Sequence, residues 1–82
     1  MSVDENATDA QITSLKSLSR TQLRILMGLR QGLRNKEIAF EMGVTENTVK
    51  TYVSMMYRRL GVSSRTQALL LLHDVLAESG LQ

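Results

Sequence analysis

Cysteine is absent from this chain, and histidine occurs only once, at His73. Without cysteine the protein can form neither a disulfide bond nor a thiolate metal site. No apolar run approaches the length that spans a membrane, and the first residues hold no basic stretch followed by an apolar one. These absences predict a cytoplasmic protein with no membrane partner, no metal ion and no cofactor.

The groupings of side chains that support catalysis are also missing. The sequence shows no nucleophile beside a base, no glycine-rich phosphate loop and no cluster of metal ligands. Glu37 and Glu41 stand four residues apart, but two surface glutamates at that spacing are usually only solvated. His73 is a single histidine on a predicted helix, where a structural or solvent-facing role is the common one. We therefore expect no enzymatic activity.

Charge is divided unevenly along the chain. All ten Lys and Arg residues lie between Lys16 and Arg65, where only three glutamates oppose them, so this segment carries a net charge of +7. The residues before and after it are acidic. A basic middle between acidic ends indicates an anionic partner, with nucleic acid as the first candidate. The alternative is a basic surface that only keeps the protein soluble.

Periodicity and capping signals predict four helices and no strand, and hence an all-α fold. Residues 1–15 are polar and acidic without helical periodicity, and we expect a flexible polar tail or linker remnant there. Residues 16–82 then form the single domain. Ser19 and Gln22 make a capping-box pattern that starts the first helix, and Gly32 suits the left-handed residue that follows it.

The second and third predicted helices are joined by a tight turn. Asn35 is expected to cap the second helix, over residues 36–42, and Thr45 to cap the third, over residues 46–60. Gly43 lies in the turn, where a positive φ is needed. The inward positions of the third helix are apolar at helical spacing: Val49, Val53, Met56 and Leu60. A short helix, a turn and a polar-faced helix are the elements of a helix-turn-helix.

The outer side of the third predicted helix carries polar and basic residues: Asn47, Lys50, Thr51, Ser54 and Arg58. Lys50 can donate to guanine, the Thr51 methyl group can meet a thymine methyl, and Ser54 can donate or accept. Lys36, with the free amides at the start of the second helix, is placed to clamp a phosphate. The alternative is an ordinary amphipathic helix whose polar face is only hydrated.

These motifs carry a family resemblance. The chain resembles the LuxR-type DNA-binding domain, a tetrahelical helix-turn-helix found in quorum-sensing regulators, NarL/FixJ-type response regulators and GerE. The likeness covers roughly residues 18–72. It rests on Gly32 and on the motifs NKEIA at 35–39, MGVTENTVKTYV at 42–53, LGV at 60–62 and SRTQA at 64–68. The resemblance implies a winged-helix-like fold of four helices without a wing, and regulation of transcription by sequence-specific binding to DNA.

The resemblance also implies roles for individual residues. Base contacts come from the positions that match Lys50, Thr51 and Ser54. Phosphate contacts come from the positions that match Asn35, Lys36, Asn47, Thr48, Tyr52, Arg58 and Arg65. At the start of its first helix the family usually has an Arg-Glu pair and a further Glu two residues on, where this chain has Thr21, Gln22 and Arg24. Met55 and Met56 also depart from the family's usual residues and are expected to make a softer core.

The fourth predicted helix, over residues 65–78, contains four consecutive leucines at 69–72 and is expected to begin at Ser63 or Ser64. Four successive positions span most of a helix circumference, so a small domain cannot bury them all. A symmetric homodimer through this helix is the commonest solution, and an unpaired apolar helix is the alternative. We expect the core to hold Leu69, Leu72 and Leu76. We expect the dimer interface to hold Leu70, Leu71 and Asp74.

Three functions fit these observations. The first is a sequence-specific transcriptional regulator of the response-regulator or quorum-sensing type, or its effector domain, which reads the major groove of double-stranded DNA with the helix at 46–60. As a homodimer it needs an inverted-repeat promoter site, and RNA polymerase is a candidate protein partner. The second is a protein-interaction module that dimerises with other LuxR-type regulators and inhibits them. The third is a sigma-factor DNA-binding segment of similar fold, although the motifs at 35–39 and 46–53 favour the LuxR type.

Overall fold

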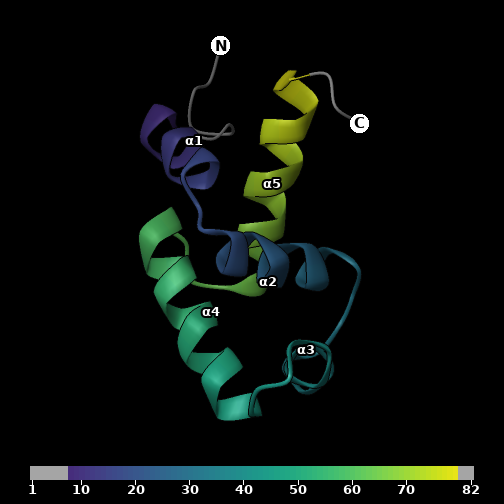
Figure 1. Ribbon diagram of the computed structural model, residues 1–82. Helices are drawn as coiled ribbons and strands as arrows, with labels where there is room; N and C mark the ends of the chain where they lie inside the picture. The colour runs from purple at the N-terminus through teal and green to yellow at the C-terminus, as the bar shows by residue number, and fades with distance from the viewer. Residues whose placement is uncertain (1–7, 80–82) are drawn as a thin grey trace.

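The computed structural model describes residues 8–79, which form five helices around one core (Figure 1). The helices are α1 (Asp9–Lys16), α2 (Arg20–Arg30), α3 (Asn35–Met42), α4 (Glu46–Leu60) and α5 (Arg65–Ser79). No strand occurs in the described residues, which confirms the all-α prediction. No helix in this part of the chain is long and apolar enough to cross a membrane.

α1 was not predicted, because we expected a flexible tail over residues 1–15; for this helix the prediction is wrong. Thr8 caps α1: its hydroxyl accepts from the backbone N–H of Gln11 at 3.0 Å, and Gln11 Oε1 accepts from the Thr8 N–H at 3.2 Å. This is the same capping box that starts α2, but the polar residues around it obscure the helical period. Leu15 is buried and fixes α1 on the core. Residues 1–7 lie outside the described part of the chain.

α2 begins and ends as predicted. Ser19 Oγ accepts from the Gln22 N–H at 3.1 Å, and Gln22 Oε1 accepts from the Ser19 N–H at 3.0 Å. Gly32 follows the helix with a φ of +88°. Gly28, inside α2, packs so close to α3 that a Cβ there would lie 3.1 Å from Cγ1 of the buried Ile38. This close approach explains a glycine at a position where it otherwise weakens a helix.

α3 begins one residue earlier than predicted. The N-cap is Arg34 and not Asn35, which is the first helical residue. Arg34 has an extended backbone, and its N–H donates to Oε1 of Glu37 at 2.7 Å. Because a carboxylate in the first turn already satisfies the start of the helix, the Asn35 side chain is not needed as a cap. α3 ends at Met42, and Gly43 follows it with a φ of +70°, which confirms the predicted turn.

α4 agrees with its prediction at both ends and on its inward face. Thr45 Oγ1 accepts from the Thr48 N–H at 3.1 Å, and Gly61 follows the helix with a φ of +71°. The predicted inward residues are all buried: Val49, Val53, Met56 and Leu60. The end of α4 is tied to the connection between α1 and α2. There Arg59 donates to the backbone oxygen of Ser17 at 3.2 Å and to its hydroxyl at 3.0 Å.

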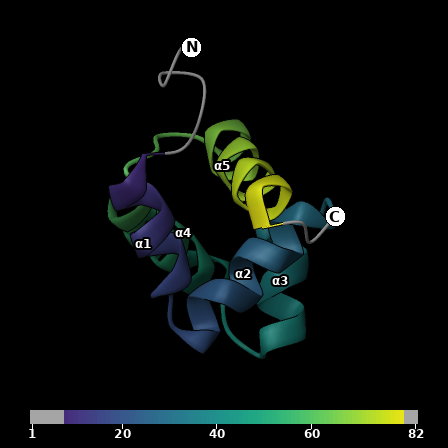
Figure 2. The same ribbon diagram turned by 90° about the horizontal axis from the view of Figure 1, so that it is seen from above.

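α2 crosses the middle of the molecule and supplies much of the core (Figure 1). Its Ile25, Leu26 and Leu29 are almost fully buried. α3 and the first half of α4 lie on one side of α2, while α1 and α5 lie on the other (Figure 1). Viewed from above, α1 lies over α4, and α5 lies beside α2 (Figure 2). The turn between α3 and α4 therefore stands at one end of the molecule, away from α1 and α5.

The face of α5 that enters the core differs from the prediction at one leucine. Ser64 Oγ accepts from the Gln67 N–H at 3.1 Å, so the helix begins at one of the two expected serines. Leu72 is buried as predicted, but Leu71, which we expected in a dimer interface, is only 5% exposed and belongs to the core. Leu70 is 57% exposed. Four identical residues in a row carry no periodicity, so the packing of α5 against α2 decides which of them are buried.

Candidate DNA-binding surface

The outer side of α4 presents a continuous polar face. Because the core residues occupy the other side of this helix, residues three and four apart share one outward direction. The members of this polar face are all exposed, as predicted: Asn47, Lys50, Thr51, Ser54 and Arg58. Lys50 Nζ lies 4.0 Å from Glu46 Oε2, and both side chains are about half exposed or more. A pair this exposed contributes little stability, so Lys50 can exchange Glu46 for another acceptor.

The turn between α3 and α4 holds these two helices in a fixed relation. The Val44 N–H donates to the backbone oxygen of Ala39 at 3.0 Å, and the Val44 side chain packs against the core. α3 packs more extensively on α4 than on any other helix, and its Ile38 and Ala39 are buried. The polar face of α4 is therefore carried by a packed unit of two helices, which holds side chains more precisely than a loop does.

The predicted phosphate contacts at the helix starts lie in ordered first turns. Lys36 is exposed and Asn35 is half-buried in the first turn of α3, where the helix dipole favours an anion. Thr48 is half-buried in the first turn of α4, and its hydroxyl lies 2.9 Å from that of Thr45. Thr48 thus helps to fix the start of α4, and any phosphate there would meet a hydroxyl that is already oriented.

Arg65, another predicted phosphate contact, also holds the fold together. Its Nη2 donates to the backbone oxygen of Leu29 at 3.0 Å and links the start of α5 to the end of α2. The guanidinium has five N–H donors, so this bond leaves others available.

Burial raises the pKa of the Tyr57 hydroxyl, and the nearby charge of Arg65 lowers it in part. Tyr57 is therefore neutral near pH 7 and remains a hydrogen-bond donor.

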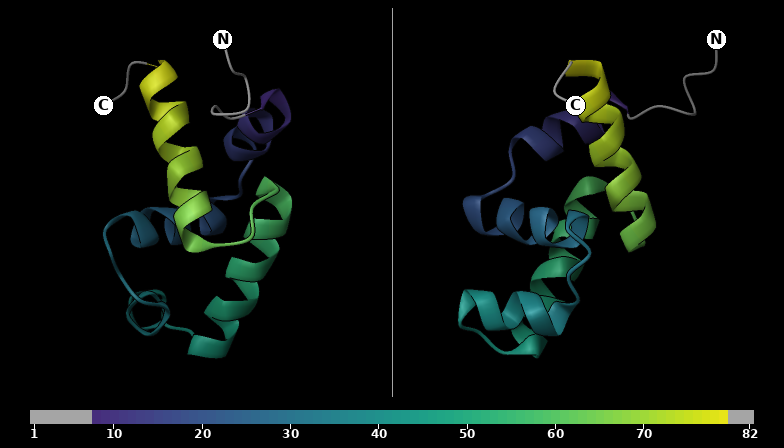
Figure 3. Two further views of the ribbon diagram at one scale, coloured as in Figure 1. Left: turned by 180° about the vertical axis from the view of Figure 1, so that it is seen from behind. Right: turned by 90° about the vertical axis from the view of Figure 1, so that its right-hand side faces the viewer.

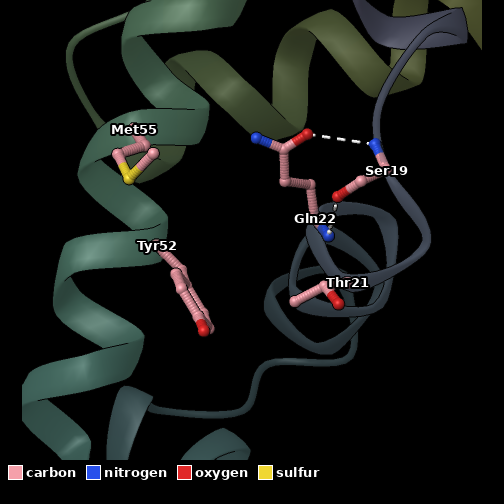
Figure 4. Close-up of a pocket in the computed structure, with 5 residues that line it drawn as sticks. All are labelled: Ser19, Thr21, Gln22, Tyr52 and Met55. Atoms are coloured by element: carbon pink, nitrogen blue, oxygen red, sulfur yellow. Dashed lines mark hydrogen bonds between the residues drawn. The ribbon is translucent and has the colours of Figure 1, made fainter.

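A hollow of about 240 Å³ lies between α4 and the start of α2 (Figure 4). Its lining residues are Ser19, Thr21, Gln22, Tyr52 and Met55. The half-buried Tyr52 side chain extends from α4 toward the start of α2 (Figure 4). A second hollow shares Gln22 and Met55 with the first and is also lined by Arg58 and Arg59. Together they form one concave strip beside the polar face of α4.

The sequence prediction missed this strip because it assigned Met55 to the core. Met56 is fully buried as expected, but Met55 is 55% exposed, so the expectation is wrong for that residue. A signal was present: the four inward positions of α4 already formed a complete stripe. An additional apolar residue directly before Met56 had to point elsewhere, since neighbouring helical positions are about 100° apart.

The exposed side of α5 is narrower than predicted. Leu69 and Leu76 are partly buried against the core, and Asp74 is partly exposed. Leu70 remains the large apolar side chain of α5 that faces outward. Of the three residues expected in a dimer interface, the structure thus leaves Leu70 and Asp74 accessible and removes Leu71.

The chemical groups on these surfaces suit binding. Amide, hydroxyl, ammonium and guanidinium groups donate hydrogen bonds to base edges and to phosphate oxygens. Within residues 8–79, no three His, Asp or Glu side chains gather to hold a metal ion. The arrangement presents hydrogen-bond donors and positive charge on one helix of a size that fits the DNA major groove.

Comparison with known proteins places this arrangement in a family. Residues 16–72 match the family model described as "Bacterial regulatory proteins, luxR family". The chain belongs to the luxR family of bacterial regulatory proteins. The resemblance drawn from the motifs at 35–39 and 42–53 is therefore confirmed, and the domain is a DNA-binding helix-turn-helix of the type found in transcriptional regulators.

Individual relatives agree with this assignment. The chain is 43% identical over 65 residues to the putative HTH-type transcriptional regulator YhjB of Escherichia coli, covering 79% of this chain and 32% of that protein. It is 41% identical over 61 residues to the glycerol metabolism activator of Pseudomonas putida, covering 74% and 28%. It is 52% identical over 48 residues to the DNA-binding transcriptional activator DevR/DosR of Mycobacterium tuberculosis, covering 57% and 22%. The chain thus matches only a third or less of each relative's length. No solved structure matches it.

Proposed function

We propose that this luxR-family domain binds a specific site on double-stranded DNA with α4 in the major groove. The observation that carries the proposal is the polar face of α4, whose five members are exposed while the opposite side of the helix is buried. Lys50 donates to guanine O6 or N7, and the Thr51 methyl group contacts a thymine methyl. Ser54 bonds either to a donor or to an acceptor on a base edge.

Residues on either side of these base contacts hold the sugar–phosphate backbone. They are Asn35, Lys36, Asn47, Thr48, Tyr52, Arg58 and Arg65. Support comes from the location of the first six on α3 and α4, and from the exposure of Lys36 and Arg58; Arg65 lies at the start of α5. Arg65 contributes with the N–H groups that its bond to Leu29 leaves free. Contacts of this kind position the protein on the duplex but carry no sequence information.

We also propose that two copies associate through α5, with Leu70 and Asp74 in the interface. The exposed leucine supports this proposal because burying it against a second copy removes apolar surface from water. A dimer places two copies of α4 in successive major grooves about 34 Å apart. The DNA site is then an inverted repeat.

Other parts of the proposal concern the whole protein. We propose that it regulates transcription in the cytoplasm, that its action is on RNA polymerase at a promoter, and that it acts by binding and not by catalysis. Purified RNA polymerase and a template carrying the selected site test this part. A transcript level that changes on addition of the protein supports it. An unchanged level on an occupied site contradicts it.

Selection from a randomised duplex pool, at two salt concentrations, tests the DNA-binding proposal directly. Enrichment of an inverted repeat supports both base reading and dimerisation. Enrichment of a single half-site supports base reading and contradicts a stable dimer of this chain. Salt-sensitive retention without enrichment contradicts sequence reading. Absence of binding at either salt concentration contradicts the proposal and leaves the inhibitory interaction module as the better function.

Lys36→Ala tests the phosphate clamp at the start of α3. We expect the variant to bind all sequences more weakly by a similar factor, and the slope of log affinity against log salt to fall by about 1. Lys16→Ala is the control, because Lys16 is an exposed lysine that lies at the end of α1 and outside the unit of α3 and α4. An unaltered salt slope in Lys36→Ala would count against a phosphate contact.

A further inference from the structure

The concave strip between α4 and the start of α2 borders the polar face of α4. Tyr52, Met55 and Arg59 lie three and four residues apart, so they follow one line along the helix beside that face. From the other side, Thr21 and Gln22 of α2 close the hollow (Figure 4). A DNA duplex that contacts the polar face is therefore brought to this strip as well.

The strip is positively charged at one end. Arg58 and Arg59 line it beside Met55. The Arg59 guanidinium is already oriented, since the backbone and hydroxyl oxygens of Ser17 accept hydrogen bonds from it. None of the residues that line the two hollows is acidic, and the first turn of α2 carries no acid. A polyanion can approach the strip without repulsion from a neighbouring carboxylate.

The geometry of the major groove places a sugar–phosphate strand on each side of an inserted helix. The groove is about 12 Å wide, so an α-helix within it lies between two sugar–phosphate strands. The start of α3, with Lys36, is proposed above to hold one strand. The start of α2 lies toward the opposite edge of the molecule from the start of α3 (Figure 3, right). The second strand therefore passes the start of α2.

We propose that the concave strip seats the sugar–phosphate backbone of this second strand, an inference that rests on the proposed binding of α4 in the major groove. The hydroxyls of Thr21 and Tyr52 donate to phosphate oxygens, and Arg58 supplies positive charge at the edge. Met55 packs against the carbon atoms of a deoxyribose. This contact covers a methionine that is 55% exposed in the free domain and makes Thr21, Gln22 and Met55 part of the DNA interface.

The first test adds one negative charge to the strip and leaves the helix start intact. Gln22→Glu keeps the side-chain oxygen that accepts from the Ser19 N–H, so α2 remains capped. Gln11→Glu is the control: it makes the same change at the same position of the capping box of α1, which lies away from α3 and the start of α4 (Figure 1). It also removes the 3.5 Å hydrogen bond from Gln11 Nε2 to the backbone oxygen of Gly61, so the stabilities of both variants are measured with their affinities. Circular dichroism confirms that both variants are folded.

We expect Gln22→Glu to weaken binding to the selected duplex and to a scrambled duplex alike, by on the order of tenfold, because a carboxylate meets a phosphate. Gln11→Glu should change either affinity by less than about twofold, since solvent and salt screen its charge. Equal weakening by the two variants would show only a general charge effect and would overturn the proposal.

The second test locates the phosphate. Each phosphate of the selected site is replaced in turn by a neutral methylphosphonate, and the loss of affinity is measured for the unchanged protein, Lys36→Ala and Thr21→Val. We expect sensitive phosphates on both strands within each half-site. Within a half-site, Lys36→Ala should reduce the sensitivity on one strand and Thr21→Val should reduce it on the other. Sensitive phosphates on only one strand of each half-site, or a Thr21→Val pattern equal to that of the unchanged protein, would overturn the proposal.

Different results contradict the proposed function and the proposed contact between the concave strip and the second sugar–phosphate strand, here called the backbone seat. A chain that selects no DNA site contradicts the proposed function, and the backbone seat with it. A chain that selects a site, but shows no effect of Thr21 and Gln22 in either test, contradicts the backbone seat alone.

Discussion

α4 and α5 are both 15 residues long, but they divide their apolar and polar residues very differently. In α4 the buried residues recur at regular helical spacing and the outer side is polar except for Met55. In α5 the leucines at 69–72 surround the helix, and Leu71 and Leu72 are buried while Leu70 is exposed. A helix with two distinct faces can sit on a core in one orientation only. A helix that is apolar nearly all round can pack on a core in several orientations, and the apolar side that stays exposed is available to a partner.

Glutamate at two neighbouring leucines tests the orientation of α5 and has the largest expected effect. Leu71→Glu buries an unpaired carboxylate, so we expect it to lower the free energy of unfolding by more than about 4 kcal/mol, enough to unfold a small domain. Leu70→Glu should change the free energy of unfolding of the monomer by about 0.5 kcal/mol or less, because the position is exposed in a single copy. Urea unfolding followed by circular dichroism measures both. Equal stabilities would mean that α5 packs with another face.

The neighbouring methionines make the corresponding test in α4. Met56→Ala should lower the free energy of unfolding by about 2–5 kcal/mol, because it leaves a cavity in the core. Met55→Ala should stay within about 0.5 kcal/mol of the unchanged protein. Thermal and urea unfolding provide the comparison. A large loss of stability in Met55→Ala would place that residue in the core after all.

Lys50→Ala tests whether the polar face of α4 contacts base edges. We expect specific binding to weaken by about 1–3 kcal/mol and the preference at one base position to relax. Site selection with the variant and with Lys16→Ala, a lysine on α1, makes the comparison. Identical selected sites for Lys50→Ala and the unchanged protein would remove Lys50 from base reading.

Removing the N-cap hydroxyl should have the smallest effect on stability, and a similar effect in α4 and α5. Thr45→Ala and Ser64→Ala each remove a hydroxyl that accepts from the first turn, so each should cost about 1 kcal/mol of stability. Thr45→Ser and Ser64→Thr keep the acceptor and serve as controls. If one alanine variant costs far more than the other, the helices differ in their starts as well as in their faces.

The contrast between these helices also explains how far the sequence prediction reached. For α4 the cap at Thr45, the regular inward stripe and the glycine after Leu60 all indicate the same helix, and the structure confirms each of them. For α5 the start was predictable from the serines, but the buried side was not, because a run of leucines is equally apolar in every direction. Leu71 was assigned to the wrong side for this reason.

The remaining differences between the sequence prediction and the structure arise where polar residues cap a helix or line the concave strip. α1 is capped by Thr8 and Gln11 and held by one well-buried leucine, which is too little apolar pattern to recognise in a polar segment. At the start of α3 the carboxylate of Glu37 accepts a hydrogen bond from the Arg34 N–H, whereas the prediction gave the capping role to Asn35. The concave strip joins side chains from α2 and α4 that are some thirty residues apart in sequence, so only the packing of those helices reveals it. The assigned DNA contacts remain predictions.

The glycine at position 28 sets the alignment of the DNA-reading unit. A Cβ there would lie 3.1 Å from Cγ1 of the almost fully buried Ile38, so the Ile38 side chain would have to shift by a few tenths of an ångström. Ile38 belongs to α3, which packs on α4, so the position of α4 is sensitive to this contact. Alanine is the better helix former, so a substitution that favours α2 on its own would disturb the packing of α3, and through it the placement of α4.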